Sequence, residues 1–271
     1  MTNTTSSGGP REMCRRSRVP WTLLALAALS WTTGATAYAQ KRPGGANEIE
    51  VLEVRPNFFM IAGAGANIAV QLGELGAVLV DTGSARMTDP VLAAIRKITN
   101  QPIRYIINTS AEPDHVGGNE KLSKAGESLI PPNNAASVNV VNEVNQTGGA
   151  AILATDNVLN RMSAPTGQAS PFPTAAWPTE TFSEDEKDTY LNGEGIQVLA
   201  QPAAHSDGDA IVFFRRSDVV VAGDVLDMNR FPVIDVEKGG SIQGEIAALN
   251  RIIDITIPET PLVWQEGGTL V

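Results

Sequence analysis

Carboxylate and imidazole side chains gather in three loops of this 271-residue chain. Glu112, Asp114 and His115 lie in the first loop, while the only other histidine, His205, and Asp224 lie in the second and third. With about three such ligands, a metal ion lowers the pKa of bound water to about 7 and makes it a nucleophile for carbonyl or phosphoryl centres. Each residue alone is more often structural, so metal-assisted hydrolysis is predicted only if the fold joins the three loops.

The elements before these loops predict that they meet. Residues 103–107 form a buried strand that leads into the first loop, residues 77–80 form a strand that ends at Asp81, and residues 87–99 have the apolar spacing of a helix between the two. This strand, helix, strand unit predicts a parallel pair. Ligands collect at the carboxyl ends of such strands, so Asp81 and the first loop are expected at one edge of the sheet.

The remaining pattern indicates a mixed α/β fold. Strands are predicted at 49–54, 58–62, 67–72, 210–214 and 219–222, and a hairpin at 190–196. A helix is predicted over 241–254 with Ser241 as N-cap and Ile242, Ile246, Leu249 and Ile253 on its packed face. Residues 126–189 are interpreted as an irregular surface insertion rather than a lid over substrate, with a short helix over 150–162 and no regular structure in the proline-rich stretch 165–178.

The N-terminus has the features of an export signal. Arg11, Arg15, Arg16 and Arg18 precede an apolar run over 19–31, and small residues follow at Ala37-Tyr38-Ala39. We expect residues 1–39 to be a cleaved signal peptide and 40–271 to be one secreted or periplasmic domain. The alternatives are a membrane anchor, for which the run is short, and the twin-arginine route, which the flanking residues fit poorly.

Composition narrows the partners. Loss of residues 1–39 removes four Arg and one Glu, so the net charge goes from −10 to −13, which argues against nucleic acid as a partner. No stable membrane association is expected after cleavage. Cys14, the only cysteine, leaves with the signal, so His, Asp and Glu must hold any metal. A small-molecule substrate is the expected partner.

Four motifs together resemble the metallo-β-lactamase superfamily. They are residues 78–83 (VLVDTG), 114–119 (DHVGGN), 205–209 (HSDGD) and 222–224 (AGD), and the resemblance runs from about residue 49 to 271. It implies an αββα sandwich, in which two mixed β-sheets lie face to face with helices outside. It also implies a site for one or two metal ions at one edge of the sandwich and metal-assisted hydrolysis as the chemistry.

The resemblance also assigns roles to residues. The family's first loop reads His-x-His-x-Asp-His, and here Ser110 and Glu112 stand at the two leading histidines. It implies a metal site of Glu112, Asp114, His115, His205 and Asp224, in which Asp224 bridges two ions and Asp114 is also the catalytic, water-orienting base. Asp81 and Ser110 are expected to contact these ligands and orient them without binding metal themselves. Zn²⁺ is the first expectation, with Mn²⁺ or iron as alternatives because the ligands are rich in oxygen.

The last family ligand is a histidine in a Pro-Gly-His-Gly turn. The chain reaches Gly267-Gly268-Thr269-Leu270-Val271 where that turn is expected, without a histidine. We therefore expect a domain that is incomplete at its C-terminal end and a site of reduced activity.

Three functions remain open from the sequence. The first is a secreted hydrolase of a small ester, lactone, β-lactam or similar substrate. The second is an iron-binding oxidoreductase of the same fold, because the superfamily's diiron branch also has Glu at the position of Glu112. The third is a non-catalytic protein that keeps the fold for binding or as a relic.

Overall fold

The computed structural model describes residues 48–129, 149–164 and 167–257. All of them belong to one compact unit, Pro43–Val271. The predicted signal peptide and the predicted turn near residue 267 lie outside the described residues. Among the described residues, no helix is long and apolar enough to cross a membrane.

Seven strands form the larger sheet, in the order β1-β2-β3-β4-β5-β6-β7. The first four are antiparallel neighbours, whereas β4 to β7 run parallel, so this sheet is mixed. The predicted crossover is confirmed, because β4 pairs in parallel with β5 through Val78 and Tyr105. The bounds are β1 Glu50–Arg55, β2 Phe58–Ala64, β3 Ala66–Gly73, β4 Gly76–Val80, β5 Ile103–Ile107, β6 Ala151–Thr155 and β7 Glu180–Phe182.

Four strands form the smaller sheet, in the order β11-β10-β9-β8, and all of its pairs are antiparallel. They are β8 Glu186–Leu191, β9 Glu194–Gln201, β10 Asp209–Phe214 and β11 Val219–Val221. The predicted hairpin joins β8 to β9 through Asn192 and Gly193, which both have positive φ angles of 58° and 72°. Two such residues make the tight turn that matches the twist of paired strands.

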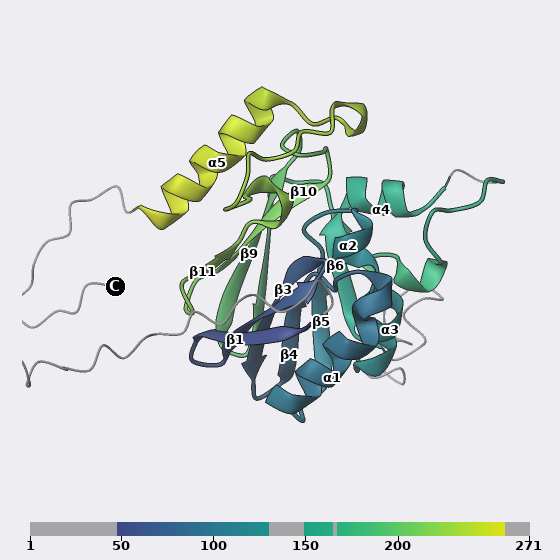
Figure 1. Cartoon of the computed structure of the whole chain (residues 1–271), viewed down its shortest axis with the longest axis vertical. Helices are drawn as coiled ribbons and strands as arrows, with labels where there is room; N and C mark the ends of the chain where they lie inside the picture. Colours follow the sequence, from purple (N-terminus) through teal and green to yellow (C-terminus); the bar gives the residue numbers. More distant parts are fainter. Residues whose placement is uncertain (1–47, 130–148, 165–166, 258–271) are drawn as a thin grey trace, which may run out of the picture. The chain divides into compact units, whose positions relative to one another are not determined.

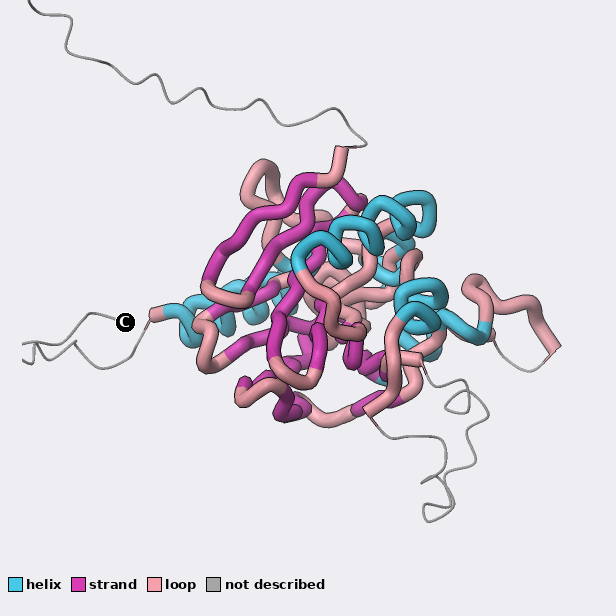
Figure 2. The backbone as a smooth tube through the Cα atoms, turned by 90° about the horizontal axis from the view of Figure 1, so that it is seen from below, coloured by secondary structure: helices cyan, strands magenta, loops and turns pink. Residues whose placement is uncertain are grey.

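The layers follow from which side chains are buried together. Inner faces of the two sheets meet in one core, in which the rings of Phe58 and Phe214 pack edge to face at 4.8 Å. Helices α1 (Thr88–Ile98) and α3 (Asn119–Ala125) cover the outer face of the larger sheet. Helix α5 (Ile242–Thr256) covers the outer face of the smaller one (Figures 1 and 2). The predicted αββα sandwich is confirmed.

The prediction of an irregular insertion over residues 126–189 is wrong for 150–162 and for 180–189, and it agrees with the described part of the proline-rich stretch. Residues 150–162 are not one helix, since β6 lies inside the larger sheet and α4 (Asp156–Met162) starts only after it. The Thr155 hydroxyl accepts from Val158 N and so marks the helix start. A short apolar run without alternation does not distinguish a buried strand from a helix, which explains the error. In the proline-rich stretch the described residues contain only a 3₁₀ turn, Thr174–Ala176.

The predicted helix over 241–254 is present as α5, with Ser241 Oγ capping Gly244 N. Of its predicted packed face, Leu249 is confirmed and the three isoleucines are wrong. Ile242, Ile246 and Ile253 are each about half exposed, at 55, 53 and 49%. Glu245 and Ala248 are the buried residues instead. A Cβ at Gly244 would lie only 1.9 Å from the Ala203 carbonyl oxygen. Gly244 therefore faces the segment before β10, and this orientation of α5 leaves its isoleucine side chains on the solvent side of the helix.

Candidate functional site

Asp81 ends β4 and ties it to the loop after β5. Its φ of 63° is in the left-handed region, which costs a non-glycine residue strain, and the residue is 1% exposed. The carboxylate accepts hydrogen bonds from Thr109 N at 2.8 Å and Thr109 Oγ1 at 2.6 Å, and it contacts His115 Nδ1 at 2.8 Å. Asp81 thereby makes the contact with the first loop that the sequence led us to expect.

The first loop is packed so tightly that two of its positions require glycine. Cβ atoms at Gly117 and Gly118 would lie 2.4 and 2.5 Å from the Ala85 nitrogen and the Thr82 oxygen. Thr82 Oγ1 in turn lies 2.8 Å from the His115 oxygen. These contacts hold the short helix α2 (Pro113–Val116) against the end of β4, which fixes the backbone of His115.

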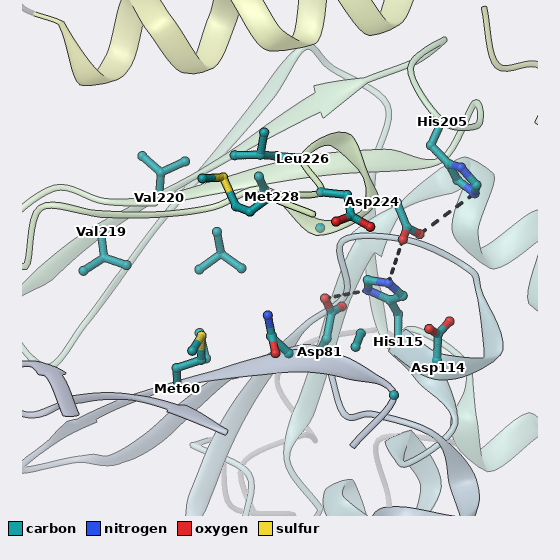
Figure 3. A pocket seen from close by; sticks show the side chains of 18 of the residues that line it. Met60, Asp81, Asp114, His115, His205, Val219, Val220, Asp224, Leu226 and Met228 are labelled. Atoms are coloured by element: carbon teal, nitrogen blue, oxygen red, sulfur yellow. Dashed lines mark hydrogen bonds and ion pairs between the residues drawn. The ribbon is translucent and has the colours of Figure 1, made fainter. Parts of the chain in front are cut away.

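His115 lies between two carboxylates (Figure 3). Its ring is 3% exposed, with Nδ1 on Asp81 and Nε2 3.1 Å from Asp224 Oδ1. Burial lowers the pKa of His115, but the charges of Asp81 and Asp224 raise it more, so the net pKa lies well above 6.5. For Asp224, burial raises the pKa and the hydrogen bond with His115 outweighs it, so the net pKa is lowered. The metal-free site therefore holds a charged imidazolium between two carboxylates.

His205 and Asp224 point two unsatisfied atoms toward each other. His205 Nδ1 lies 2.8 Å from the Val233 carbonyl oxygen, to which it must donate, because a carbonyl only accepts. In the neutral ring Nε2 is then the acceptor nitrogen, and it lies 3.9 Å from Asp224 Oδ2. Burial lowers the pKa of His205, but the hydrogen bond to Val233 and the charges of Asp224, Asp209 and Glu112 raise it more, so the net pKa lies above 6.5 and the metal-free site also attracts a proton to Nε2. Nε2 and Asp224 Oδ2 are both buried, and neither has a hydrogen-bond partner among the residues that the structure describes. Two electron-rich buried atoms that face each other are stabilised by a cation between them.

Glu112 lies on the same side of the site as His205 and forms an ion pair with a lysine. Its Oε1 lies 3.8 Å from His205 Nε2 and 2.6 Å from Lys238 Nζ. Lys238 lies 126 residues from Glu112 and was not among the site residues predicted from the sequence. No motif or spacing in the sequence connects the two.

Ser110 and Asp114 flank the same centre. Ser110 is fully buried, and its side chain is hydrogen-bonded to the Asp224 carboxylate, whose pKa it helps to lower. It also accepts from the backbone nitrogen of Glu112 at 3.2 Å. Asp114 is exposed and lines the pocket beside the site. The structure thus brings all seven predicted site residues to one edge of the sandwich.

The site is close to a metal-binding arrangement without reaching one. In the described part of the chain, no group of three or more His, Cys, Asp or Glu side chains is arranged to hold a metal ion. Tetrahedral ligands about 2.1 Å from a zinc ion are about 3.4 Å apart. The separations of 3.8 and 3.9 Å around His205 Nε2 are somewhat longer. The unsatisfied atoms of His205 and Asp224 fit a cation, while Glu112 would have to turn away from Lys238 to join them.

A cavity of about 880 Å³ opens from this centre and runs between the two sheets. His115, His205 and Asp224 lie at one end (Figure 3). Apolar and polar side chains both line its length. The apolar ones are Val54, Phe58 and Met60 from the larger sheet, and Val219, Val220, Val221, Leu226 and Met228 from β11 and the segment after it; the polar ones include Arg55, Asn67, Asp218, Asp227, Asn229 and Arg230. The arrangement suits a ligand with a polar group at the centre and an apolar group along the cavity.

The sequence matches a known protein family and a characterised relative. The family model of the Metallo-beta-lactamase superfamily matches residues 62–258. A linear primary-alkylsulfatase from a Pseudomonas species is 26% identical over 207 residues, which cover 68% of this chain and 39% of that protein. The chain thus spans about two fifths of the length of this relative.

Solved structures share the fold. A metallo-beta-lactamase from Pontibacter korlensis superimposes with a TM-score of 0.53 at 16% identity, over 76% of this chain and 85% of that one. The metallo-beta-lactamase SMB-1, bound to 2-mercaptoethanesulfonate, gives 0.55 at 16% identity over 78% of each chain. A B3 metallo-beta-lactamase with an active site glutamic acid gives 0.54 at 17% identity over 77% of this chain and 76% of that one. At these identities the likeness concerns the fold.

Proposed function

The chain belongs to the metallo-beta-lactamase superfamily, whose members generally bind divalent metal ions, and we propose that it hydrolyses a small ester at a metal site built on His205 and Asp224. The observation that carries the proposal is the pair of buried, unpartnered atoms, His205 Nε2 and Asp224 Oδ2, 3.9 Å apart. A site with no use for a cation would pair or expose them.

The proposed site has defined roles for the residues around it. His205 and Asp224 hold the ion, and His115 and Asp114 offer a second position on the far side of Asp224. A divalent ion there, which we propose to be zinc, supplies Lewis acidity and acidifies water. Asp81 orients the His115 ring through Nδ1, and Ser110 Oγ donates to Asp224 and so restricts its rotation.

Asp114 is the proposed base. It is exposed at the cavity and has no hydrogen bond that would keep its carboxylate turned away. From there it can orient a water molecule toward the substrate and take its proton. The buried walls around His115 limit access of bulk water, which strengthens each of these interactions.

An ester with an apolar substituent is the proposed substrate class. The apolar length of the cavity supports it, and so does the relative that is named an alkylsulfatase, a hydrolase of alkyl esters of sulfuric acid. The lactamase names of the structural neighbours keep a lactam or lactone as the alternative. The neighbour named for an active site glutamic acid offers a parallel for Glu112 beside a metal centre.

The test combines metal analysis with hydrolysis by the purified chain. After growth with zinc, manganese and iron supplied together, about one zinc ion per chain is expected. Hydrolysis of p-nitrophenyl esters should increase from acetate to octanoate and stop with a chelator. His205→Ala should abolish it, whereas Lys124→Ala, a change on the exposed face of α3, should not. Metal-free, folded protein, or hydrolysis that survives chelator, would contradict the proposal, and iron in place of zinc would support the oxidoreductase alternative.

Export belongs to the same proposal. The arginine-rich start, apolar run and small residues before residue 40 support cleavage of a signal peptide. Expression of the full chain in a Gram-negative host, followed by N-terminal sequencing of the periplasmic fraction, should give a chain that starts at Gln40. Uncleaved chain in the cytoplasm would contradict it.

A further inference from the structure

Lys238 is a cation that the chain places inside the proposed metal site. Its Nζ lies 2.6 Å from Glu112 Oε1 and 3.0 Å from Asp235 Oδ2. The same Glu112 oxygen lies 3.8 Å from His205 Nε2. The ammonium group is therefore hydrogen-bonded to a carboxylate that could join His205 and Asp224 as a third ligand.

The backbone around Lys238 is fixed to the loop that carries His205. Asp235 N donates to the His205 oxygen at 2.8 Å. The Lys238 oxygen accepts from Asp207 N at 2.9 Å and from the Arg161 guanidinium at 2.5 Å. The 3₁₀ turn Val236–Lys238 then ends at Gly239, in the left-handed region at φ 84°. These hydrogen bonds fix the backbone of Lys238, and its side chain extends from there to Glu112.

Electrostatics makes Lys238 and a metal ion competitors. A cation bound to His205 and Glu112 would be close to the ammonium group, and like charges at such distances repel. The ion pair between Lys238 Nζ and Glu112 Oε1, at 2.6 Å, holds the ammonium group beside this ligand. A metal ion can use Glu112 only if the ion pair with Lys238 breaks.

We propose that Lys238 withholds Glu112 from the metal, so that the first metal position is held by His205 and Asp224 with low affinity. The inference rests on the proposed function, because it requires that metal binds there. It assigns Lys238 a role in setting metal affinity, and it makes Glu112 a reserve ligand that becomes available when the ammonium group is removed.

The experiment is a double-mutant cycle on Zn²⁺ affinity, measured by competition with a chromophoric chelator. The four proteins are the wild-type chain, Lys238→Met, Glu112→Gln and the double variant. Lys238→Met should bind zinc at least about tenfold more tightly, since it frees a ligand. Glu112→Gln should change affinity by less than about threefold in the wild-type background and remove the gain in the Lys238→Met background.

Two controls separate charge from packing and folding. Lys238→Arg keeps the positive charge and should keep the low affinity of the wild type. Lys124→Met removes an exposed lysine that pairs with Glu120 at 2.7 Å on α3, and it should leave zinc affinity unchanged. Should Lys238→Met fail to fold, the Arg variant and Glu112→Gln still decide, because a loss of more than about tenfold in Glu112→Gln would show that the glutamate already binds metal.

The outcomes distinguish this inference from the proposed function. Zinc bound by the wild type with no gain in Lys238→Met would overturn the role of Lys238 and leave the metal site in place. Absence of zinc from all four folded proteins would overturn both. A gain in Lys238→Met that the second substitution cancels would establish the competition.

Discussion

The two sides of the candidate site differ in how their polar atoms are satisfied. On the Asp81 side, the carboxylate has three partners, and His115 uses both ring nitrogens. On the His205 side, His205 Nε2, Asp224 Oδ2 and both oxygens of the buried Glu245 have no hydrogen-bond partner within the described part of the chain. Both sides are buried and ionisable, so burial alone does not explain the difference.

The contrast indicates that the Asp81 side stabilises the fold, whereas the His205 side has unsatisfied polar atoms that can bind a ligand. A saturated network lowers the free energy of the folded chain without any addition. Buried polar atoms without partners raise the free energy of the folded chain, and a bound cation lowers it again. Substitution of Asp81 should therefore act mainly on folding, whereas substitution of His205 should act mainly on binding.

The largest effect is expected for Asp81→Ala. It removes three contacts at once and leaves His115 beside a single carboxylate, so the free energy of unfolding should fall by about 3 kcal/mol. Urea denaturation of the metal-free protein measures it. Asp89→Ala, at a carboxylate that is 74% exposed on α1, is the control and should change stability by less than about 0.5 kcal/mol. Equal effects of the two substitutions would abolish the distinction between the sides.

His205→Ala should separate binding from folding. Loss of one of the two proposed ligands should weaken zinc binding about 100-fold, which is about 2.7 kcal/mol. Metal-free stability should fall by only about 1 kcal/mol, because the hydrogen bond to Val233 is lost while an unsatisfied nitrogen is removed. Chelator competition and urea denaturation of the same preparation give both values. A metal-free loss as large as that of Asp81→Ala would contradict the comparison.

Glu245→Gln should stabilise the protein in a pH-dependent way. Burial raises the pKa of Glu245 from 4.5 to about 7. The folded state thus binds the proton more tightly than the unfolded state, and wild-type stability falls as the pH rises from 4.5 through 7. The variant lacks this penalty, so it should gain about 3 kcal/mol above pH 7 and nothing below pH 4.5.

Thermal unfolding of the metal-free protein between pH 4 and 8 measures this difference. Glu53→Gln on the exposed strand β1 is the matched control and should show no such pH dependence. A constant offset between Glu245→Gln and the wild type at every pH would mean that the gain has a cause other than ionisation.

The sequence predicts the Asp81 side better than the His205 side. Asp81 and His115 follow strands of one βαβ unit, so strand periodicity alone brings them to the same edge. His205 and Asp224 follow further strands, and only the resemblance to a family predicts that they meet the first loop.

Three features were beyond reach of sequence patterns, for physical reasons. Lys238 meets Glu112 through a tertiary contact over 126 residues, with no local pattern to announce it. The apolar run of β6 is compatible with both strand and helix, and its neighbours in the sheet decide. The rotation of α5 follows from the close approach of Gly244 to Ala203, which outweighs burial of the isoleucine stripe.

The first loop, which lies at one end of the cavity, and the wall formed by β11 and the segment after it also differ in how freely their side chains can change. Gly117 and Gly118 leave no room for even a methyl group, so the first loop can accept almost no new side chain without a shift of its backbone. Leu226 and Met228 are 42 and 84% exposed, and their replacement disturbs no packed core. In a lineage that acquires new substrates, or in a library selected for them, successful substitutions should accumulate on the wall formed by β11 and the segment after it. The sequence of the first loop should stay constant.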